Sequence, residues 1–414
     1  MKHGSESEYF VTVECELADR PPFGNAQHIN DLNDRRCLHR LSLIEGIFPA
    51  ALEVLEELRG LPAERRHYFI RDPTLRIGVD QALLHTKALP AQHTLDWTER
   101  LLSRAVSLLK SHSKPAPLEA EQCTSVSLGE QLLRPFVWQD PNSDLCSQCI
   151  QSLIHEFVPD AHVDCPSEEN IRTLQAAVKL LDRLLPRLTP SVLNHVIAVV
   201  IISERGMPGC GHRGFRSGTT SSLPGVMVLS ASELATPWRA AESLLHESLH
   251  LKFIDLEFTH SMNLKASDEA DLWTIRPPWI NLSDRNDGWP PIRAMTAAHV
   301  YMGLALFFRS GQMLATNSDT VVDYPASELQ EATKKVTSRA QYLVGELDAR
   351  LQSLGPAGQY FVTWLKWLLA KPNGSNANRT PRSSGTGEAQ AVPIGSMCQA
   401  ASQCANETEG SGSG

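Results

Sequence analysis

The stretch from Thr236 to Ile254, TPWRAAESLLHESLHLKFI, predicts the helix around which the fold is organised. Thr236 can cap the N-terminus of this helix, and Pro237 suits its first position, where the backbone N–H has no helical partner. Apolar residues recur at helical spacing in the rest of the stretch: Leu244, Leu245, Leu249, Phe253 and Ile254. We therefore expect an amphipathic helix with a buried apolar stripe.

This helix contains the pentapeptide His246-Glu247-Ser248-Leu249-His250. Residues four apart lie on one face of a helix, so His246 and His250 can bind the same divalent metal ion. Glu247 lies one step round the helix, close enough to contact a metal-bound water or a substrate group. Two histidines do not define the chemistry of a metal site, because the third ligand decides its class.

Composition excludes several classes of protein. The chain has 414 residues and a formal net charge of −9, and its basic residues are scattered, so we expect no nucleic-acid partner and no anionic-membrane partner. The N-terminus lacks the apolar core of a signal peptide, and no apolar run approaches the length of a membrane span. Nine cysteines in such a chain are typical of thiols rather than of a disulfide framework. These features together predict a cytoplasmic protein.

The pattern along the chain predicts an α+β fold that is predominantly helical, with a small β-sheet next to the metal-binding helix. Runs rich in β-branched residues predict strands at 196–202 and 225–230. Helical periodicity is found at 41–61, 96–111, 169–185, 294–309, 327–354 and 360–369.

We expect three regions along the chain. They are an N-terminal helical region at 1–115, a metal-binding catalytic domain at 116–371 with its core at 190–310, and a disordered Gly/Ser-rich tail at 372–414.

One candidate function is a zinc metallopeptidase. A third histidine six residues beyond His250, as in astacin-like peptidases, is absent because Leu256 stands there. A thermolysin-like peptidase has a glutamate about twenty residues after the second histidine, and Glu269 is near that place. In this alternative Glu269 is the third zinc ligand and Glu247 is the general base.

A second candidate function follows from a resemblance that covers roughly residues 190–310. The chain resembles the HExxH-motif peptide-modifying proteins encoded beside ribosomally made, post-translationally modified peptides. The resemblance rests on these runs: Ser217-Gly218-Thr219-Thr220, Leu223 to Ser230, Leu244 to Phe253, Pro277-Pro278-Trp279, Pro290-Pro291-Ile292-Arg293 and Ala298-His299-Val300-Tyr301.

The resemblance implies a non-haem iron, 2-oxoglutarate-dependent oxygenase that hydroxylates a β-carbon of a side chain in a precursor peptide. It implies that His246, His250 and His299 bind Fe(II), with Glu247 as either a weak ligand or a partner of the ligands. The all-histidine set departs from the usual facial triad of two histidines and one carboxylate.

The 2-oxoglutarate co-substrate has a distal carboxylate that an arginine fork binds well. Arg293 is the predicted anchor for this carboxylate, with Arg276 and Arg309 as second choices. The expected partner is a precursor peptide, held along the strand at 226–229. The tail at 372–414 is an alternative source of that peptide.

Overall fold

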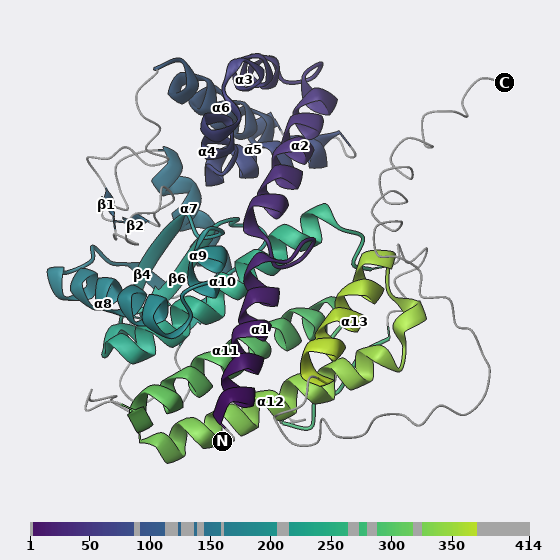
Figure 1. Ribbon diagram of the computed structural model, residues 1–414. Helices are drawn as coiled ribbons and strands as arrows, with labels where there is room; N and C mark the ends of the chain where they lie inside the picture. Colours follow the sequence, from purple (N-terminus) through teal and green to yellow (C-terminus); the bar gives the residue numbers. More distant parts are fainter. Residues whose placement is uncertain are drawn as a thin grey trace, which may run out of the picture. The chain divides into compact units, whose positions relative to one another are not determined.

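The computed structural model describes residues 3–86, 92–111, 123–125, 136–138, 145–158, 161–204, 215–263, 273–279, 288–317 and 325–370. Within these residues, the structure has thirteen α-helices and one small mixed β-sheet, which lies toward one side in Figure 1. The predicted fold class, a predominantly helical α+β fold, is confirmed. Residue 269 and the tail from 371 onward lie outside the described residues.

Six helices form the N-terminal part of the chain: α1 (His3–Asp19), α2 (Ala26–Ile44), α3 (Pro49–Gly60), α4 (Ala63–Ile70), α5 (Pro73–His85) and α6 (Gln92–Lys110). The prediction of one helix at 41–61 is wrong, because α2 ends at Ile44 and α3 begins at Pro49. Proline has no backbone N–H to donate and disfavours helical geometry in the preceding residue. Phe48 is accordingly extended, with φ −115° and ψ 105°.

Along the chain, the strands of the sheet come after these N-terminal helices and before the helix that contains His246 and His250. Its strands are β1 (Cys123–Ser125), β2 (Phe136–Trp138), β3 (Ala161–Val163), β4 (Ala198–Glu204), β5 (Ser217–Gly218) and β6 (Val226–Ser230). The order is β1-β2-β4-β6-β5, with β3 also paired to β4. The connecting helices are α7 (Leu145–Phe157), α8 (Glu168–Leu184), α9 (Leu188–Leu193) and the short 3₁₀ helix η1 (Ala231–Leu234).

Strand β6 is an inner strand, parallel to β4 on one side and antiparallel to β5 on the other. Its main-chain groups are therefore already paired along the register from Val228 to Leu229. Among the described residues, β5 lies at this edge of the sheet and pairs with Val228 and Leu229 of β6. The expectation that a peptide is held along 226–229 stays a prediction.

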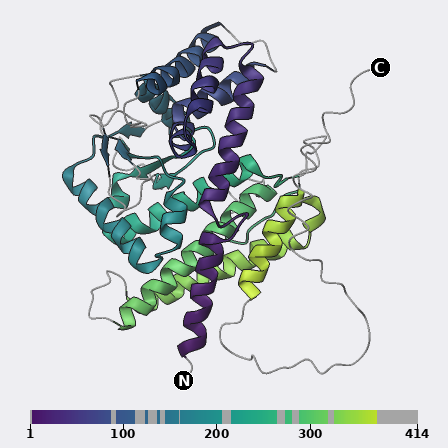
Figure 2. The same ribbon diagram turned by 45° about the horizontal axis from the view of Figure 1, so that its top comes forward.

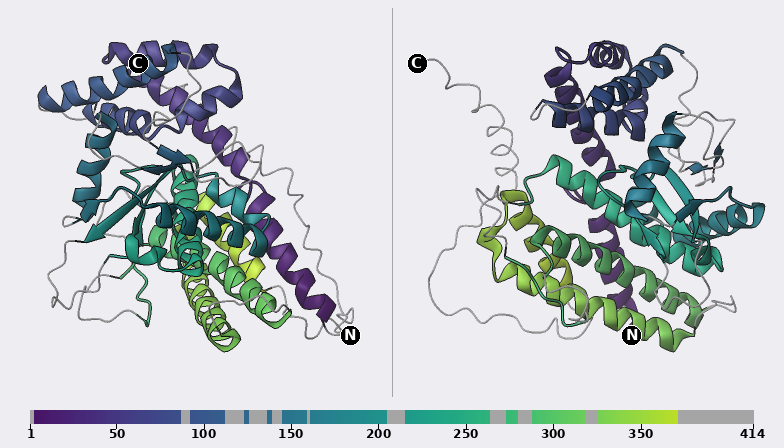
Figure 3. Two further views of the ribbon diagram at one scale, coloured as in Figure 1. Left: turned by 90° about the vertical axis from the view of Figure 1, so that its left-hand side faces the viewer. Right: turned by 180° about the vertical axis from the view of Figure 1, so that it is seen from behind.

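Four helices complete the fold: α10 (Pro237–Thr259), α11 (Pro291–Asn317), α12 (Ala326–Asp348) and α13 (Pro356–Ala370). The predicted cap is present, because the Thr236 hydroxyl accepts a hydrogen bond of 3.2 Å from the Arg239 backbone N–H. Helix α10 packs against α8 and α11, and α11 runs beside α12 (Figures 2 and 3). None of the described helices is long and apolar enough to cross a membrane.

By their contacts, residues 1–373 group into one unit and 374–414 into another. The expected boundary near residue 115 and the expected disorder of the tail stay predictions.

Candidate metal centre

His246 and His250 face each other on successive turns of α10. Their Nε2 atoms lie 3.2 Å apart. Two imidazole nitrogens bound to one tetrahedral ion, each at about 2.0–2.1 Å, lie about 3.3 Å apart. The pair therefore already has the spacing that a shared metal ion requires.

Both imidazoles are neutral near pH 7. Burial lowers the pKa of His246 to about 4, helped by the positive charge of Arg216. Burial also lowers the pKa of His250 to about 3, helped by His246 and Arg293. A neutral imidazole has a lone pair that can bind a metal, whereas an imidazolium does not. His246 nevertheless keeps 37% of its side chain exposed, so an approaching ligand can reach it.

The fully buried polar side chains of α10 have dedicated partners, whereas His246 and His250 are only partly buried. Ser243 donates to Glu233, and Ser248 donates to the Leu244 carbonyl. Glu247 accepts from Ser217 and Thr219, and Asp255 pairs with Arg76 and His195. Lys252 donates to the Leu17 and Gly24 carbonyls and to Ser191. Buried polar groups without partners are costly, so such pairing is expected. His246 and His250 lie within hydrogen-bond distance of each other, and His246 Nε2 also faces Glu247 Oε1 at 3.9 Å.

Glu247 is buried beside the pair, and two hydroxyl groups, one in the edge strand β5 and one directly after it, hold its carboxylate. Ser217 Oγ donates to Oε1 at 2.7 Å, and Thr219 Oγ1 donates to Oε2 at 3.2 Å. Oε1 also lies 3.9 Å from His246 Nε2. Burial raises the pKa of Glu247 to about 7, and the two hydroxyls partly oppose that rise. Glu247 can therefore hold or release a proton near neutral pH.

Sequence reasoning did not single out Ser217 and Thr219 as partners of Glu247. Both lie in a run that the resemblance includes, and residues two apart on a strand share one face. The intervening Gly218 packs against the Phe157 ring, where a Cβ would lie 2.6 Å from ring atoms. The alternation of hydroxyl, glycine and hydroxyl was the signal that could have identified this pair.

His299 lies on α11 and is fully buried. Its ring packs beside Phe253 and Phe361, at centroid distances of 6.3 and 5.8 Å, and a hydrogen bond with the Leu249 backbone acts on the ring. Burial lowers the pKa of His299 to about 3, with further effects from nearby charges that include His250. His299 is therefore a packed core side chain whose charge would be felt at His250, and its role as a metal ligand stays a prediction.

The structure does not bring the three histidines into one coordination sphere. Within the described ranges, no group of three or more His, Cys, Asp or Glu side chains is placed to hold a metal ion. The structure brings together two of the three predicted ligands, His246 and His250, through their Nε2 atoms. His299 is the third ligand that the resemblance implies. The alternative third ligand, Glu269, lies outside the described residues. The residues therefore fit a metal bound by two imidazoles, with the third ligand still to be determined.

Of the three candidate anchors for 2-oxoglutarate, Arg293 is the one whose charge acts on the histidine pair. It is exposed, its guanidinium lies 4.8 Å from the centroid of the Trp289 ring, and its charge lowers the pKa of His250. Arg309 lies sixteen residues further along α11, about 24 Å at the rise of an α-helix, and bonds Gln312. Arg276 is exposed, and its carbonyl accepts a hydrogen bond from Tyr342. Arg293 is thus the best placed of the three.

The chain matches no protein-family model, and no curated protein is similar to it at a significant level.

Proposed function

We propose that this protein is a non-haem iron, 2-oxoglutarate-dependent oxygenase that hydroxylates a β-carbon of a side chain in a precursor peptide. The observation that carries the proposal is the pair of His246 and His250 on one face of α10, with their Nε2 atoms 3.2 Å apart. The resemblance of residues 190–310 to peptide-modifying proteins supplies the substrate class.

His246 and His250 would hold Fe(II), and the resemblance makes His299 the proposed third ligand, although its ring would have to leave its packed position in the core to reach the same ion. Bound iron would supply the oxidising chemistry with O₂ that an unactivated carbon requires. In the overall reaction one oxygen atom of O₂ enters the new hydroxyl group, and the other enters the succinate left when 2-oxoglutarate loses CO₂. Three protein ligands leave positions for a bidentate 2-oxo acid and for O₂.

Arg293 would bind the distal carboxylate of 2-oxoglutarate. It is exposed and close to His250, and its guanidinium is oriented by Trp289. A planar fork of N–H donors matches a carboxylate better than an ammonium group does. This position beside the metal ligands lets the keto-acid end of the co-substrate reach the histidine pair.

A zinc peptidase is the second candidate, and one observation favours it. Glu247, with its pKa raised to about 7, has the proton affinity of a general base or acid. Its two oxygens, however, already accept hydrogen bonds from Ser217 and Thr219, which turn the carboxylate toward the sheet edge. A carboxylate held in this way is better suited to positioning His246 than to acting as a general base that activates a water molecule.

The deciding experiment is anaerobic titration of the metal-free protein with Fe(II) and 2-oxoglutarate, followed by an absorption spectrum. We expect a weak visible charge-transfer band only when both are present, because it reports chelation by the 2-oxo acid. The His250→Ala variant should lack the band. The matched control is His260→Gln, since His260 caps the same helix and bonds Thr259 and the Leu256 carbonyl.

No band in the parent protein, together with one tightly bound zinc per chain, would reject the oxygenase proposal. Peptide cleavage would then be assayed with the zinc-loaded protein.

A further inference from the structure

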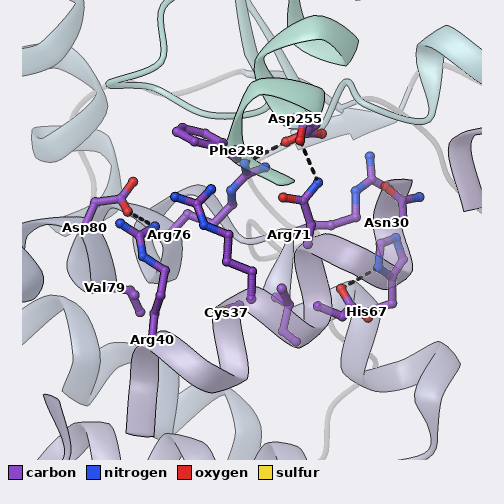
Figure 4. A pocket seen from close by; sticks show the side chains of 14 residues that line it. Asn30, Cys37, Arg40, His67, Arg71, Arg76, Val79, Asp80, Asp255 and Phe258 are labelled. Carbon is purple, nitrogen blue, oxygen red and sulfur yellow. Dashed lines mark hydrogen bonds and ion pairs between the residues drawn. The ribbon is translucent and has the colours of Figure 1, made fainter. Parts of the chain in front are cut away.

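A second site, unrelated to the histidine pair, lies on the other side of α10. A cavity of about 40 Å³ opens between α2, α4, α5 and the C-terminal half of α10. Its lining is rich in charged groups: Asp34, Arg36, Arg40, His67, Arg71, Arg76, Asp80 and Asp255. In Figure 4, Arg40 points toward Asp80, and Arg76 points toward Asp255.

Positive charge exceeds negative charge in this cavity, because four guanidinium groups face three carboxylates. Each carboxylate is already engaged. Asp80 pairs with Arg40, Asp255 is shared between Arg76 and His195, and Asp34 bonds His67.

Arg36 and Arg71 have no carboxylate within ion-pair distance among the described residues. Arg71 donates to the carbonyls of Asn194 and Val196 instead. Arg36 lies over the Phe258 ring, 4.7 Å from its centroid. Burial lowers the pKa of both to about 10, so both remain charged at neutral pH. A half-buried cation without a counter-ion is unfavourable unless an anion joins it.

A further polar atom in the lining is unsatisfied. His67 Nδ1 is 2.9 Å from Asp34, but its Nε2 is buried and has no hydrogen-bond partner among the described residues. Buried polar atoms of this kind are usually met by water or by a ligand.

The size of the cavity restricts what it can hold. A water molecule needs about 10–15 Å³ measured in this way, so the cavity has room for about three waters. One tetrahedral oxyanion takes a similar space, whereas a nucleotide or a peptide side chain with its backbone does not fit inside.

We propose that this cavity binds one oxyanion of phosphate size, with Arg36 as its principal ligand and the guanidinium groups of Arg40 and Arg76 beside it. Arginine forks donate paired N–H groups that match the oxygens of phosphate. The bound anion would link α2 and α5 to α10, because Arg76 also holds Asp255. The proposal does not rest on the iron site, since it concerns different residues and needs no metal.

The test is calorimetric titration of the metal-free full chain with inorganic phosphate at constant ionic strength, set by NaCl. We expect one saturable site in the parent protein. The Arg36→Gln variant should bind phosphate at least tenfold more weakly. The matched control is Arg35→Gln, because Arg35 is the neighbouring residue of α2, is exposed and does not line the cavity. Its affinity should stay within twofold of the parent.

A second titration with glycerol phosphate distinguishes the source of the oxyanion. Binding of free phosphate alone indicates the inorganic ion, and binding of both indicates a phosphoryl group on a larger molecule. If Arg36→Gln does not fold, Arg36→Lys replaces it, because lysine keeps the charge and loses the fork; we expect at least threefold weaker binding. Absence of saturable binding, or equal affinity in the Arg36 and Arg35 variants, overturns the proposal.

Discussion

Arg76 of α5 and Asp255 of α10 form an ion pair in which Arg76 Nη2 lies 2.7 Å from Asp255 Oδ1. Both side chains are largely buried, at 14% and 8% exposed. The pair connects the N-terminal helices to α10, the helix of the His246–His250 pair. Because removal of one partner leaves an uncompensated buried charge, such a pair is sensitive to mutation.

We expect Asp255→Ala to lower the free energy of unfolding by about 3–5 kcal/mol. The matched control is Asp348→Ala, because Asp348 pairs with Lys366 at the surface, where the loss should be under about 1 kcal/mol. Urea unfolding followed by circular dichroism measures both values. Equal losses in the two variants would show that the Arg76 pair has no special structural role.

Asp255 also holds His195, and this contact predicts a dependence of stability on pH. Burial lowers the pKa of His195 to about 4, although the hydrogen bond to Asp255 opposes that shift. The unfolded chain binds a proton at His195 near pH 6.5, whereas the folded chain does not until about pH 4. Stability should therefore fall as pH decreases from about 6.5 to 4, by at most about 3 kcal/mol from this residue.

The measurement is thermal unfolding of the metal-free protein at several pH values between 4 and 7.5. His195→Gln should be less stable at pH 7.5 but should show a flatter decline toward acid. His39→Gln, a change at an exposed position of α2, should follow the parent curve. A decline as steep in His195→Gln as in the parent would assign the acid sensitivity to other groups.

Local patterns in the sequence were sufficient to predict the helix and the strand around the histidine pair. The cap at Thr236, the apolar stripe of α10 and the β-branched run of β4 depend on neighbouring residues, and the structure contains all three. The break before Pro49 was missed because apolar periodicity continues across it, while the backbone cannot remain helical in front of the proline.

Contacts between distant segments could not be predicted in the same way. Glu247 is held by Ser217 because β5 pairs with β6 beside α10, and no local spacing encodes that pairing. The cavity around Arg36 likewise forms only when α2, α5 and α10 pack together. The His246–His250 spacing was predictable since one helical turn sets it, whereas the position of His299 depends on how α11 packs against α10.

The histidine pair predicts the metal content of the purified protein. We expect about one divalent metal ion per chain in the parent, and less than a tenth of that in His246→Ala and His250→Ala, because each variant leaves a single imidazole of the pair. Elemental analysis by mass spectrometry measures this ratio. His260→Gln should keep the parent ratio, and full metal content in either alanine variant would mean that the metal is bound elsewhere.

The third ligand separates the two candidate functions. Under the oxygenase proposal, His299→Ala should lower Fe(II) affinity at least tenfold, and Glu269→Gln should leave it unchanged. Under the peptidase alternative, Glu269→Gln should lower zinc affinity, and His299→Ala should leave it unchanged. His299 is fully buried, so its truncation also leaves a cavity that destabilises the core. Thermal unfolding in the presence of a chelator measures that effect separately, and a loss of affinity no larger than in His260→Gln would remove His299 from the ligand set.

The co-substrate anchor makes a prediction about kinetics. Arg293→Gln should raise the KM for 2-oxoglutarate at least tenfold while changing kcat less, because the lost fork binds the distal carboxylate rather than the reacting carbon. The measurement is succinate formation against 2-oxoglutarate concentration with a saturating peptide.

The matched control is Arg339→Gln, since Arg339 lies over the Trp279 ring at 5.0 Å, as Arg293 lies over Trp289 at 4.8 Å. Of these two arginines, only Arg293 acts on the pKa of His250, so only the Arg293 variant should change the KM for 2-oxoglutarate. An unchanged KM in Arg293→Gln would mean that another group binds the co-substrate carboxylate. Arg276 would then be the next residue to change, because Arg309 lies about 24 Å further along α11 than Arg293.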